Sequence, residues 1–355
     1  MQIARLTLTL GLMLLTLTAA ARADGACANP RQMDGFKTCA DVAKAEEEGS
    51  LVLYSTDPES AAESLLGQFR AMFPKIRTNY LRLQAGGLYA KLLAERQGKV
   101  YLADLVQLSD MSFAADFHKR GGYMHYVSPE MAAYKPEYKS SPEGYWNWGS
   151  VVAAAIAYNP TLVSAAEAPK TYLDAYDPKW ADAISVKVTI SGLQHVTWYV
   201  LRKIHGNDYW QHFLPLKPRA FDSYVQQFDR LVNGQDKVVM TAQYSGYLIM
   251  KAKGAPVEFV YPPEGLIASP QPYGVINEAP HPNAARLFMD WFLGVPGQTA
   301  MTKAMYYHSP RDDVAPPPGG VPITNFKLLF PDDWTAFQAT HAQYVKEWNT
   351  LTGLR

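Results

Sequence analysis

The sequence predicts an α/β protein built as two lobes, for three reasons. At 355 residues the chain is long enough for two domains with separate cores. Strand-like and helix-like segments alternate along it, with polar or glycine-rich turns after the strands, which is typical of a mixed, mostly parallel sheet flanked by helices. An apolar segment over 151–158 separates two such units, and we expect it to cross between them as a strand.

The N-terminus differs from the rest of the chain. Arg5 is followed by an apolar run over 6–18 and by the small-x-small cleavage signal at 21–23. We expect a secretory signal peptide over 1–23 and not a membrane anchor, since this run is shorter than the roughly 20 residues of a membrane-spanning helix. The 33 basic and 33 acidic side chains of the whole chain balance, which argues against a nucleic-acid partner.

Both cysteines, Cys27 and Cys39, follow the proposed cleavage site. In an exported chain we expect such a close pair to form a disulfide, which stabilises a short loop by about 3 kcal/mol in the chain-entropy model. A lipid anchor on Cys27 is the alternative, but residues 24–26 lack the apolar residue that such signals carry. A metal site made of two cysteines alone is not expected.

The first unit opens with a strand over 51–54, where four β-prone apolar residues run into the turn Ser55-Thr56-Asp57. Pro58 suits the first turn of the amphipathic helix that follows, which Ser55 or Thr56 can cap. A short helix over 38–48 is expected before the strand over 51–54. After this strand we expect the helix 58–73, the strand 78–83, the helix 88–97 and the strand 102–107, which gives the order β, α, β, α, β.

The second unit follows the irregular stretch 123–148, which is rich in Tyr, Pro and Ser, and the crossing strand. The segment 270–276 is expected to cross back. The lobes are therefore predicted as 24–150 with 277–355, and 151–276. Between the crossings we expect strands over 183–190, 238–241 and 257–261, and helices over 193–205, 208–214, 224–233 and 242–254.

Motifs of catalysis are absent from the sequence, which contains no nucleophile elbow, zinc-protease helix, phosphate loop or dinucleotide fingerprint. We therefore expect no enzyme and no cofactor. The eight histidines show no metal-ligand spacing, so no metal site is expected. His195, at a helix start, could contact a ligand, whereas His118, His205 and His212 suit the surface or the core.

Several helices are expected to begin directly after a strand or turn with small or hydroxyl residues. Each start offers unpaired N–H donors and about half a positive charge, so two or three that converge on one cleft could hold an anion. These starts are Ser55-Thr56, Gly86-Gly87, Ser191-Gly192 and Asp222-Ser223.

Five groups of residues carry a resemblance to a known family: 51–55, 103–106, 156–160, 281–298 and 306–311. In order and spacing they resemble the periplasmic solute-binding proteins of ABC importers, and more closely the branch of the ferric-iron-binding proteins. The similarity covers roughly 51–314. It implies a type II periplasmic-binding-protein fold, whose two lobes close by hinge motion on a ligand that passes to a membrane permease. We expect a monomer.

Residues that hold iron in that branch are mostly replaced here. The resemblance implies two adjacent tyrosines, a histidine after the first strand and a glutamate after the strand 103–106. Tyr244 matches the first tyrosine, but Ser245, Pro58 and Ser109 stand at the other positions. Ferric ion prefers several anionic oxygens, so these replacements argue against iron as the bound solute. Tyr247 could still supply a second phenolate.

The comparison suggests an organic anion instead. In the iron branch a companion anion sits at the helix start that Ser191-Gly192 matches, and Ser245 and Gly246 leave room beside it. We expect a carboxylate or phospho-ester at the helix starts, with its body against aromatic residues that include Trp146 or Trp148. The predicted ligand-binding residues are Ser55, Thr56, Gly86, Gly87, Ser109, Ser191, Gly192, His195, Ser223, Tyr244 and Tyr247. The alternative is a ferric site with Tyr244 and Tyr247.

Overall fold

A single mixed sheet runs through both lobes of the protein. The structure, a computed structural model, describes residues 27–140, 142–187, 191–221 and 223–352. Within them, ten strands join in the order β4-β3-β5-β11-β6-β9-β7-β8, with β10 beside β6 and β12 beside β11. The strands are β3 (Ser50–Ser55), β4 (Arg77–Arg82), β5 (Leu105–Gln107), β6 (Asn147–Tyr158), β7 (Ile184–Lys187), β8 (Arg219–Phe221), β9 (Val238–Gln243), β10 (Glu258–Val260), β11 (Leu266–Val275) and β12 (Leu328–Leu329).

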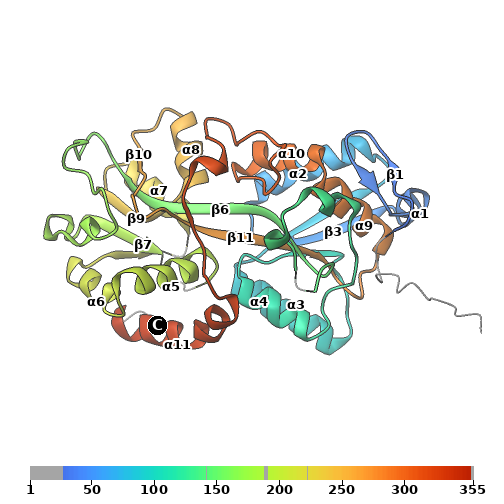
Figure 1. Ribbon diagram of the computed structural model, residues 1–355, viewed down its shortest axis with the longest axis horizontal. Coiled ribbons are helices and arrows are strands. Elements are labelled where there is room, and N and C mark those ends of the chain that lie inside the picture. Colours follow the sequence, from blue (N-terminus) through green and yellow to red (C-terminus); the bar gives the residue numbers. More distant parts are fainter. Residues whose placement is uncertain (1–26, 141, 188–190, 222, 353–355) are drawn as a thin grey trace, which may run out of the picture.

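Two long antiparallel strands, β6 and β11, join the lobes (Figure 1). Every residue of β6 is buried, which explains its nearly continuous apolar run. The end of β11 pairs with β5 of the first lobe, and the second half of β6 pairs with β9 of the second. The register of β11 against β6 shifts between Gln271 and Pro272, as at a β-bulge. The predicted crossings are confirmed, although both strands begin earlier than expected.

Parallel pairing fills the rest of each half of the sheet. In the first lobe β3 is parallel to β4 and β5, and in the second lobe β7 is parallel to β8 and β9. The strand β8 was not expected, because its three residues resemble the start of the following helix. The predicted α/β class with mixed sheets and crossing strands is confirmed.

Helices cover both faces of the first lobe, with α2 and α10 on one side of the sheet and α3 and α4 on the other (Figure 1). On the α2 side, the ring of Phe69 lies 5.1 Å from that of Phe288 and 5.4 Å from that of Trp291. The nine-residue helix α4 was missed by the sequence analysis. The helices are α1 (Val42–Glu48), α2 (Glu59–Met72), α3 (Ala85–Gly98), α4 (Met111–Lys119), α9 (Pro282–Leu293) and α10 (Val295–Met305).

The second lobe carries its own helices and also receives the C-terminal helix. Arg202 of α5 pairs with Glu347 of the last helix, α11, which also contacts α4. Figure 1 shows α11 beneath α5 and α6, and this helix also packs on α4 of the first lobe. The predicted lobe boundaries stay a prediction. The helices are α5 (Leu193–His205), α6 (Tyr209–Phe213), α7 (Tyr224–Val232), α8 (Tyr244–Ala252) and α11 (Trp334–Thr352), and the 3₁₀ turns are Pro129–Ala133, Pro136–Tyr138, Asp174–Tyr176, Pro178–Trp180, Leu214–Leu216 and Ile323–Asn325.

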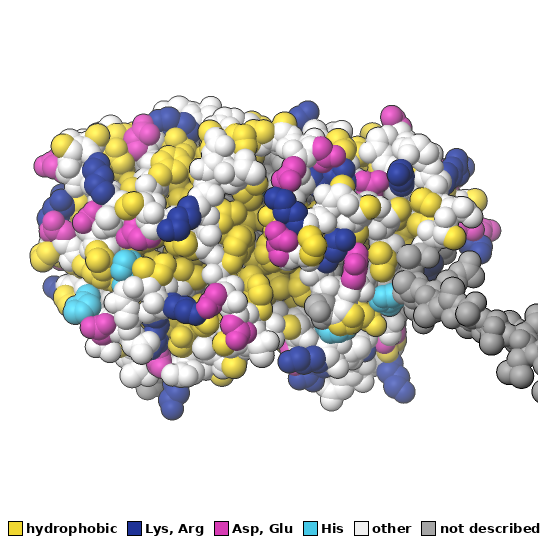
Figure 2. Space-filling view, in the orientation of Figure 1, with side chains coloured by type: hydrophobic (Ala, Val, Ile, Leu, Met, Phe, Trp, Pro, Cys, Tyr) yellow, Lys and Arg dark blue, Asp and Glu magenta, His cyan; other side chains and the backbone are white. Residues whose placement is uncertain are grey.

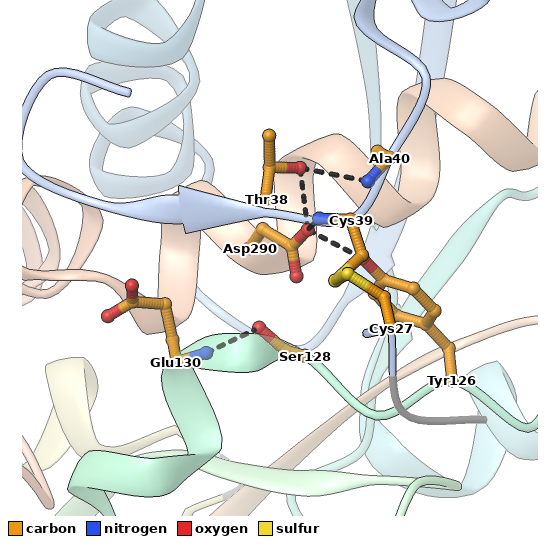
Figure 3. The surroundings of a disulfide bond; sticks show 8 residues. All are labelled: Cys27, Thr38, Cys39, Ala40, Tyr126, Ser128, Glu130 and Asp290. Atoms are coloured by element: carbon orange, nitrogen blue, oxygen red, sulfur yellow. Dashed lines mark hydrogen bonds between the residues drawn. A yellow bond between two sulfur atoms is a disulfide. The ribbon is translucent and has the colours of Figure 1, made fainter. Parts of the chain in front are cut away.

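The predicted disulfide between Cys27 and Cys39 is confirmed, with the two Cα atoms 5.8 Å apart. It closes a loop that contains the short strands β1 (Arg31–Gln32) and β2 (Lys37–Thr38). Figure 3 shows how this loop is held: the carboxylate of Asp290 in α9 accepts hydrogen bonds from the Thr38 hydroxyl at 2.7 Å and the Cys39 amide at 2.9 Å. The loop is therefore fixed to the first lobe.

The surface and the length of the helices agree with an ordinary globular chain. Basic and acidic side chains are interspersed on the face that Figure 2 shows, without a large area of one sign. In the part of the chain that the structure describes, none of the helices is both long and apolar enough to cross a membrane. The predicted signal peptide lies outside the described residues.

Candidate ligand-binding site

A cavity of about 110 Å³ lies between the lobes and is lined by residues of both. Val152 and Gln271 contribute from the crossing strands. From the first lobe come Thr56, Asp57, Pro58, Arg82, Gln84, Ala85, Ser109 and Tyr307, and from the second lobe Lys187, Ser191, Gly192, Leu193, Ser223, Tyr224, Val225 and Gln243.

Five helices begin at this cavity. The residues that precede their first turns are Pro58 before α2, Gln84 before α3, Gly192 before α5, Ser223 before α7 and Gln243 before α8, and all five line the cavity. Each start brings unpaired N–H groups and a partial positive charge of about half a unit. The cavity wall is therefore electropositive even apart from its side chains, and it suits an anion.

Two basic side chains, one from each lobe, add to the positive charge of the helix starts. Arg82 is the last residue of β4 and Lys187 the last of β7, and both line the cavity. The Lys187 ammonium lies 5.8 Å from the centre of the Tyr224 ring. Tyr224 lines the cavity, and its hydroxyl is buried without a hydrogen-bond partner among the described residues.

One acidic residue, Asp57, also lines the cavity and is buried. Its carboxylate accepts hydrogen bonds from the hydroxyls of Tyr273 at 2.9 Å and Tyr307 at 3.2 Å. Burial raises the pKa of Asp57, although these hydroxyls and the charge of Arg82 act in the opposite direction. Asp57 thus fixes the inner wall of the cavity and opposes part of its positive charge.

The turn after β3 is held by a glutamine network. Oε1 of Gln107 accepts hydrogen bonds from the Thr56 amide and the Thr56 hydroxyl, both at 2.9 Å, and lies 2.8 Å from the Ser55 hydroxyl. The Gln107 amide in turn donates to Oε1 of Gln271 at 2.9 Å. Thr56 reaches the cavity, whereas Ser55 is fully buried beneath it and positions the turn.

The two lobes touch directly beside the cavity. The Gly192 amide donates a hydrogen bond to Asp110 Oδ2 at 2.7 Å, and a side chain at Gly192 would meet the Ser109 carbonyl oxygen at 2.7 Å. Asp110 begins α4 and accepts a second hydrogen bond from the Ser112 amide through Oδ1. The start of α5 is therefore seated on the start of α4.

The structure brings five of the predicted site residues to the cavity and places six elsewhere. Thr56, Ser109, Ser191, Gly192 and Ser223 line it. The predicted residues outside the lining are Ser55, Gly86, Gly87, His195, Tyr244 and Tyr247. Asp222 lies outside the described residues.

The predicted aromatic residues take part in packing. Tyr244 is buried, and its ring lies 5.6 Å from the ring of His308 and 5.1 Å from that of Phe259. Tyr247 lies in the same cluster, 5.3 Å from Phe259. Trp148 is buried and lies 4.9 Å from Tyr138. Neither Trp148 nor Trp146 lines the cavity.

His195 is also buried, with its ring stacked 3.9 Å from that of Phe337 in α11. Burial lowers the pKa of His195 to about 4, and the nearby charge of Asp110 raises it. Near physiological pH its imidazole is therefore neutral. His195 lies behind the start of α5, which lines the cavity.

The lining side chains that sequence reasoning did not predict include Asp57, Arg82, Lys187 and Tyr224. The first three share a signal that could have found them. Each lies at or just after the carboxyl end of a strand in a parallel pair, and ligands of α/β proteins bind at such ends. Tyr224 carries no such signal, because it is the first residue of a helix.

Comparison with known proteins agrees with this architecture. The model of the bacterial extracellular solute-binding protein family matches residues 101–324, and the chain belongs to this family. No curated protein matches the sequence. The family comprises the solute-binding components of ABC importers, which act outside the cytoplasm and deliver ligands to a permease.

Solved structures of periplasmic binding proteins share the fold. AfuA from Actinobacillus pleuropneumoniae, determined with exogenous fructose-6-phosphate bound, is 20% identical with a TM-score of 0.77, and the match covers 86% of this chain and 99% of AfuA. Iron-bound HitA from Pseudomonas aeruginosa is 19% identical with a TM-score of 0.74, over 86% and 99%. Trichodesmium FutA, in complex with iron and citrate, is 18% identical with a TM-score of 0.68, over 86% and 100%. The type II periplasmic-binding-protein fold is thereby confirmed.

Proposed function

We propose that this protein captures a small organic anion, with a phosphate ester or carboxylate group, in the interlobe cavity and delivers it unchanged to an ABC permease. The convergence of five helix starts with Arg82 and Lys187 carries this proposal. Backbone N–H groups and the two cations would bind the charged group. We also propose that residues 1–23 direct export and are then removed.

The mixed character of the lining favours an organic anion over inorganic phosphate. Tyr224 offers an aromatic face and a buried hydroxyl without a partner in the described chain, while Gln243 and Thr56 add polar groups. Such a wall suits the hydroxylated or carbon body of a larger molecule. The fructose-6-phosphate complex of AfuA is a precedent within the fold for a ligand of this kind.

Ferric iron is the second candidate, because HitA and FutA hold iron in the same fold. The cavity offers Asp57 and the phenols of Tyr224 and Tyr307 as oxygen ligands. Burial raises the pKa of Tyr224 and strongly raises that of Tyr307, which opposes the phenolate form. Two basic side chains and five helix starts also repel a bare cation, so an organic anion fits better.

Calorimetric titration of the untagged mature protein tests the two candidates. The panel contains sugar phosphates, phosphonates, di- and tricarboxylates and ferric citrate. We expect at least one organic anion to bind with micromolar or tighter affinity, and Lys187→Met to weaken it at least tenfold. The control Lys253→Met removes an exposed lysine outside the cavity and should bind normally.

Two results would overturn the organic-anion proposal. One is tight ferric binding with a tyrosinate-to-iron absorption band and no binding of the anions. The other is an affinity that Lys187→Met leaves unchanged while the variant remains folded by circular dichroism. Chromatography of the released ligand tests the absence of catalysis, because a transported solute must be recovered unaltered.

A further inference from the structure

Three side chains from distant parts of the chain meet behind the cavity. They are Asp110 at the start of α4, His195 in the first turn of α5 and His341 in α11. Nδ1 of His195 and Nε2 of His341 each lie 3.9 Å from Asp110 Oδ2, and the three ligand atoms all lie within 4.8 Å of one another. Within the described residues this is the one group of His, Cys, Asp and Glu side chains with a metal-site arrangement.

Hydrogen bonding sets the tautomer of His195. The Thr340 hydroxyl donates to the Phe337 carbonyl at 2.6 Å, so its oxygen can only accept from Nε2 of His195, which lies 3.3 Å away. Nε2 of the neutral imidazole is therefore protonated, and Nδ1 presents a lone pair. This lone pair is buried and faces the Asp110 carboxylate, with no hydrogen-bond partner in the described chain.

His341 repeats this arrangement from the other side. Its Nε2 atom is also buried without a hydrogen-bond partner among the residues described, and it faces the same carboxylate oxygen. A distance of 3.9 Å is too long for a hydrogen bond from either ring. Asp110 Oδ2 accepts one hydrogen bond, from Gly192, so it retains a second lone pair. When the proton of neutral His341 is on Nδ1, its Nε2 atom presents a lone pair as well, and three electron-pair donors then point into one space.

We propose that Asp110, His195 and His341 bind a divalent transition-metal ion, for which Zn²⁺ is the best fit. Two imidazoles and one carboxylate are a donor set typical of zinc, whereas Ca²⁺ and Mg²⁺ prefer oxygen ligands alone. Bonds of about 2.0–2.1 Å in a tetrahedral site hold ligand atoms about 3.4 Å apart. The group, whose atoms lie up to 4.8 Å apart, therefore has to contract around the ion. The bond between His195 Nε2 and Thr340 orients the ring, as outer partners of zinc histidines do.

This ion is distinct from the transported solute. None of the three ligands lines the cavity, but Ser109 and Gly192, which adjoin the site, do. The ligands come from the first lobe, the second lobe and the C-terminal helix, so a bound ion stabilises the arrangement in which all three are in contact. The chain has no free cysteine that would compete for the metal.

The test uses untagged, chelator-treated mature protein. Titration with Zn²⁺ should give one ion per chain with a submicromolar dissociation constant and a higher melting temperature. Co²⁺ in its place should give the visible absorption of a tetrahedral site with nitrogen and oxygen ligands. His341→Gln should weaken Zn²⁺ binding at least 100-fold. The matched control His212→Gln removes an exposed histidine far from the group and should change neither measurement.

Absence of stoichiometric Zn²⁺ binding by the wild type, or equal binding by folded His341→Gln, would refute the metal site. The Co²⁺ spectrum of the wild type decides the question even if the variant is unstable, because an octahedral spectrum from all-oxygen ligands contradicts the assignment. Titration of the metal-free protein with the organic anions is a separate measurement, so failure of one proposal can be told from failure of the other.

Discussion

The backbone amide of Gly192, at the start of α5, donates a 2.7 Å hydrogen bond to the carboxylate of Asp110, at the start of α4. These residues belong to different lobes, and both hydrogen-bonding groups are buried at the edge of the cavity. Gly192 has φ +55° and ψ −131°, a conformation that side-chain-bearing residues rarely adopt. The approach of the two helix starts therefore depends on glycine at this position.

Gly192→Ala should weaken ligand binding at least tenfold. The added Cβ atom would lie 2.7 Å from the carbonyl oxygen of Ser109, so the lobes must separate or the start of α5 must shift. Calorimetry with the anion found in the screen measures the affinity, and small-angle scattering measures whether the molecule becomes more open.

The control for this variant is Gly86→Ala. Gly86 also lies at a helix start, but a Cβ atom there would meet nothing within 4 Å. Affinity should be unchanged, and stability should rise slightly because alanine is the better helix former. Equal loss of affinity in both variants would show that the contact between Gly192 and Ser109 is unimportant.

Tyr224→Phe should weaken anion binding by about two- to thirtyfold, the equivalent of a lost hydrogen bond of roughly 0.5–2 kcal/mol. The reason is that Tyr224 lines the cavity and its buried hydroxyl lacks a partner within the described structure, so a small movement of the ring on binding would let it bond the anion. Folding should be unaffected, since no hydrogen bond inside the protein is removed. Calorimetry and a thermal melt provide the two measurements.

Tyr247→Phe serves as the comparison, because Tyr247 lies in the aromatic cluster outside the cavity. The reverse pattern, with a loss in Tyr247→Phe and none in Tyr224→Phe, would place the ligand beside α8 and revive the ferric alternative.

His308→Gln should reduce the loss of stability in mild acid. Burial lowers the pKa of His308, so the unfolded chain binds a proton that the folded protein excludes. The stability that this histidine contributes is present above its unfolded pKa of about 6.5 and is lost as the pH falls below it, by up to about 1.4 kcal/mol per pH unit. Glutamine cannot titrate and can still donate to the Val321 carbonyl, which accepts from His308 at 3.0 Å.

Urea unfolding at pH 7.5 and 5.5 measures this effect. The difference between the two pH values should be smaller in His308→Gln than in the wild type. His212→Gln, which removes an exposed histidine, should keep the wild-type difference. An identical pH dependence in all three proteins would mean that His308 is protonated equally in the folded and unfolded chains.

Replacing both Cys27 and Cys39 by serine should lower the free energy of unfolding by about 3 kcal/mol, the chain-entropy value for a loop of this length. The hydrogen bonds of Thr38 and Cys39 to Asp290 remain possible, so the fold should persist. Urea unfolding of the variant should match that of the reduced wild type. A variant as stable as the oxidised protein would contradict the prediction.

Local patterns were enough to predict the framework of the protein. The apolar run in β6 could be interpreted because it is too short for a membrane span and too continuous for a strand with one exposed face. The helix starts at Thr56, Ser191 and Ser223 were found from the strand-turn-helix order, which involves neighbours in sequence. Such features are set by contacts within about ten residues.

The missed parts of the site depend on tertiary structure. At the start of α3 the residues that reach the cavity are Gln84 and Ala85, and not the glycines that follow them. The side chain of Tyr244 turns into packing against Phe259. Which residues of α3 and α8 face the cavity depends on how each helix is rotated about its axis. The sequence pattern does not give this rotation to within one residue.

The sequence also contained no indication that Asp110, His195 and His341 lie close together. No spacing rule links three residues on three helices that lie far apart in the chain. They meet only because α11, at the far end of the chain, packs on both α4 and α5.

The irregular register between Gln271 and Pro272 lies inside the strand that connects the lobes. A β-bulge bends its strand and increases the local twist, so this irregularity changes the direction of β11 where it passes between the lobes. Gln271 lines the cavity and accepts the hydrogen bond of Gln107, which in turn holds Thr56. The crossing strand β11 is thus linked through one side chain, Gln271, and Gln107 to the cavity residue Thr56.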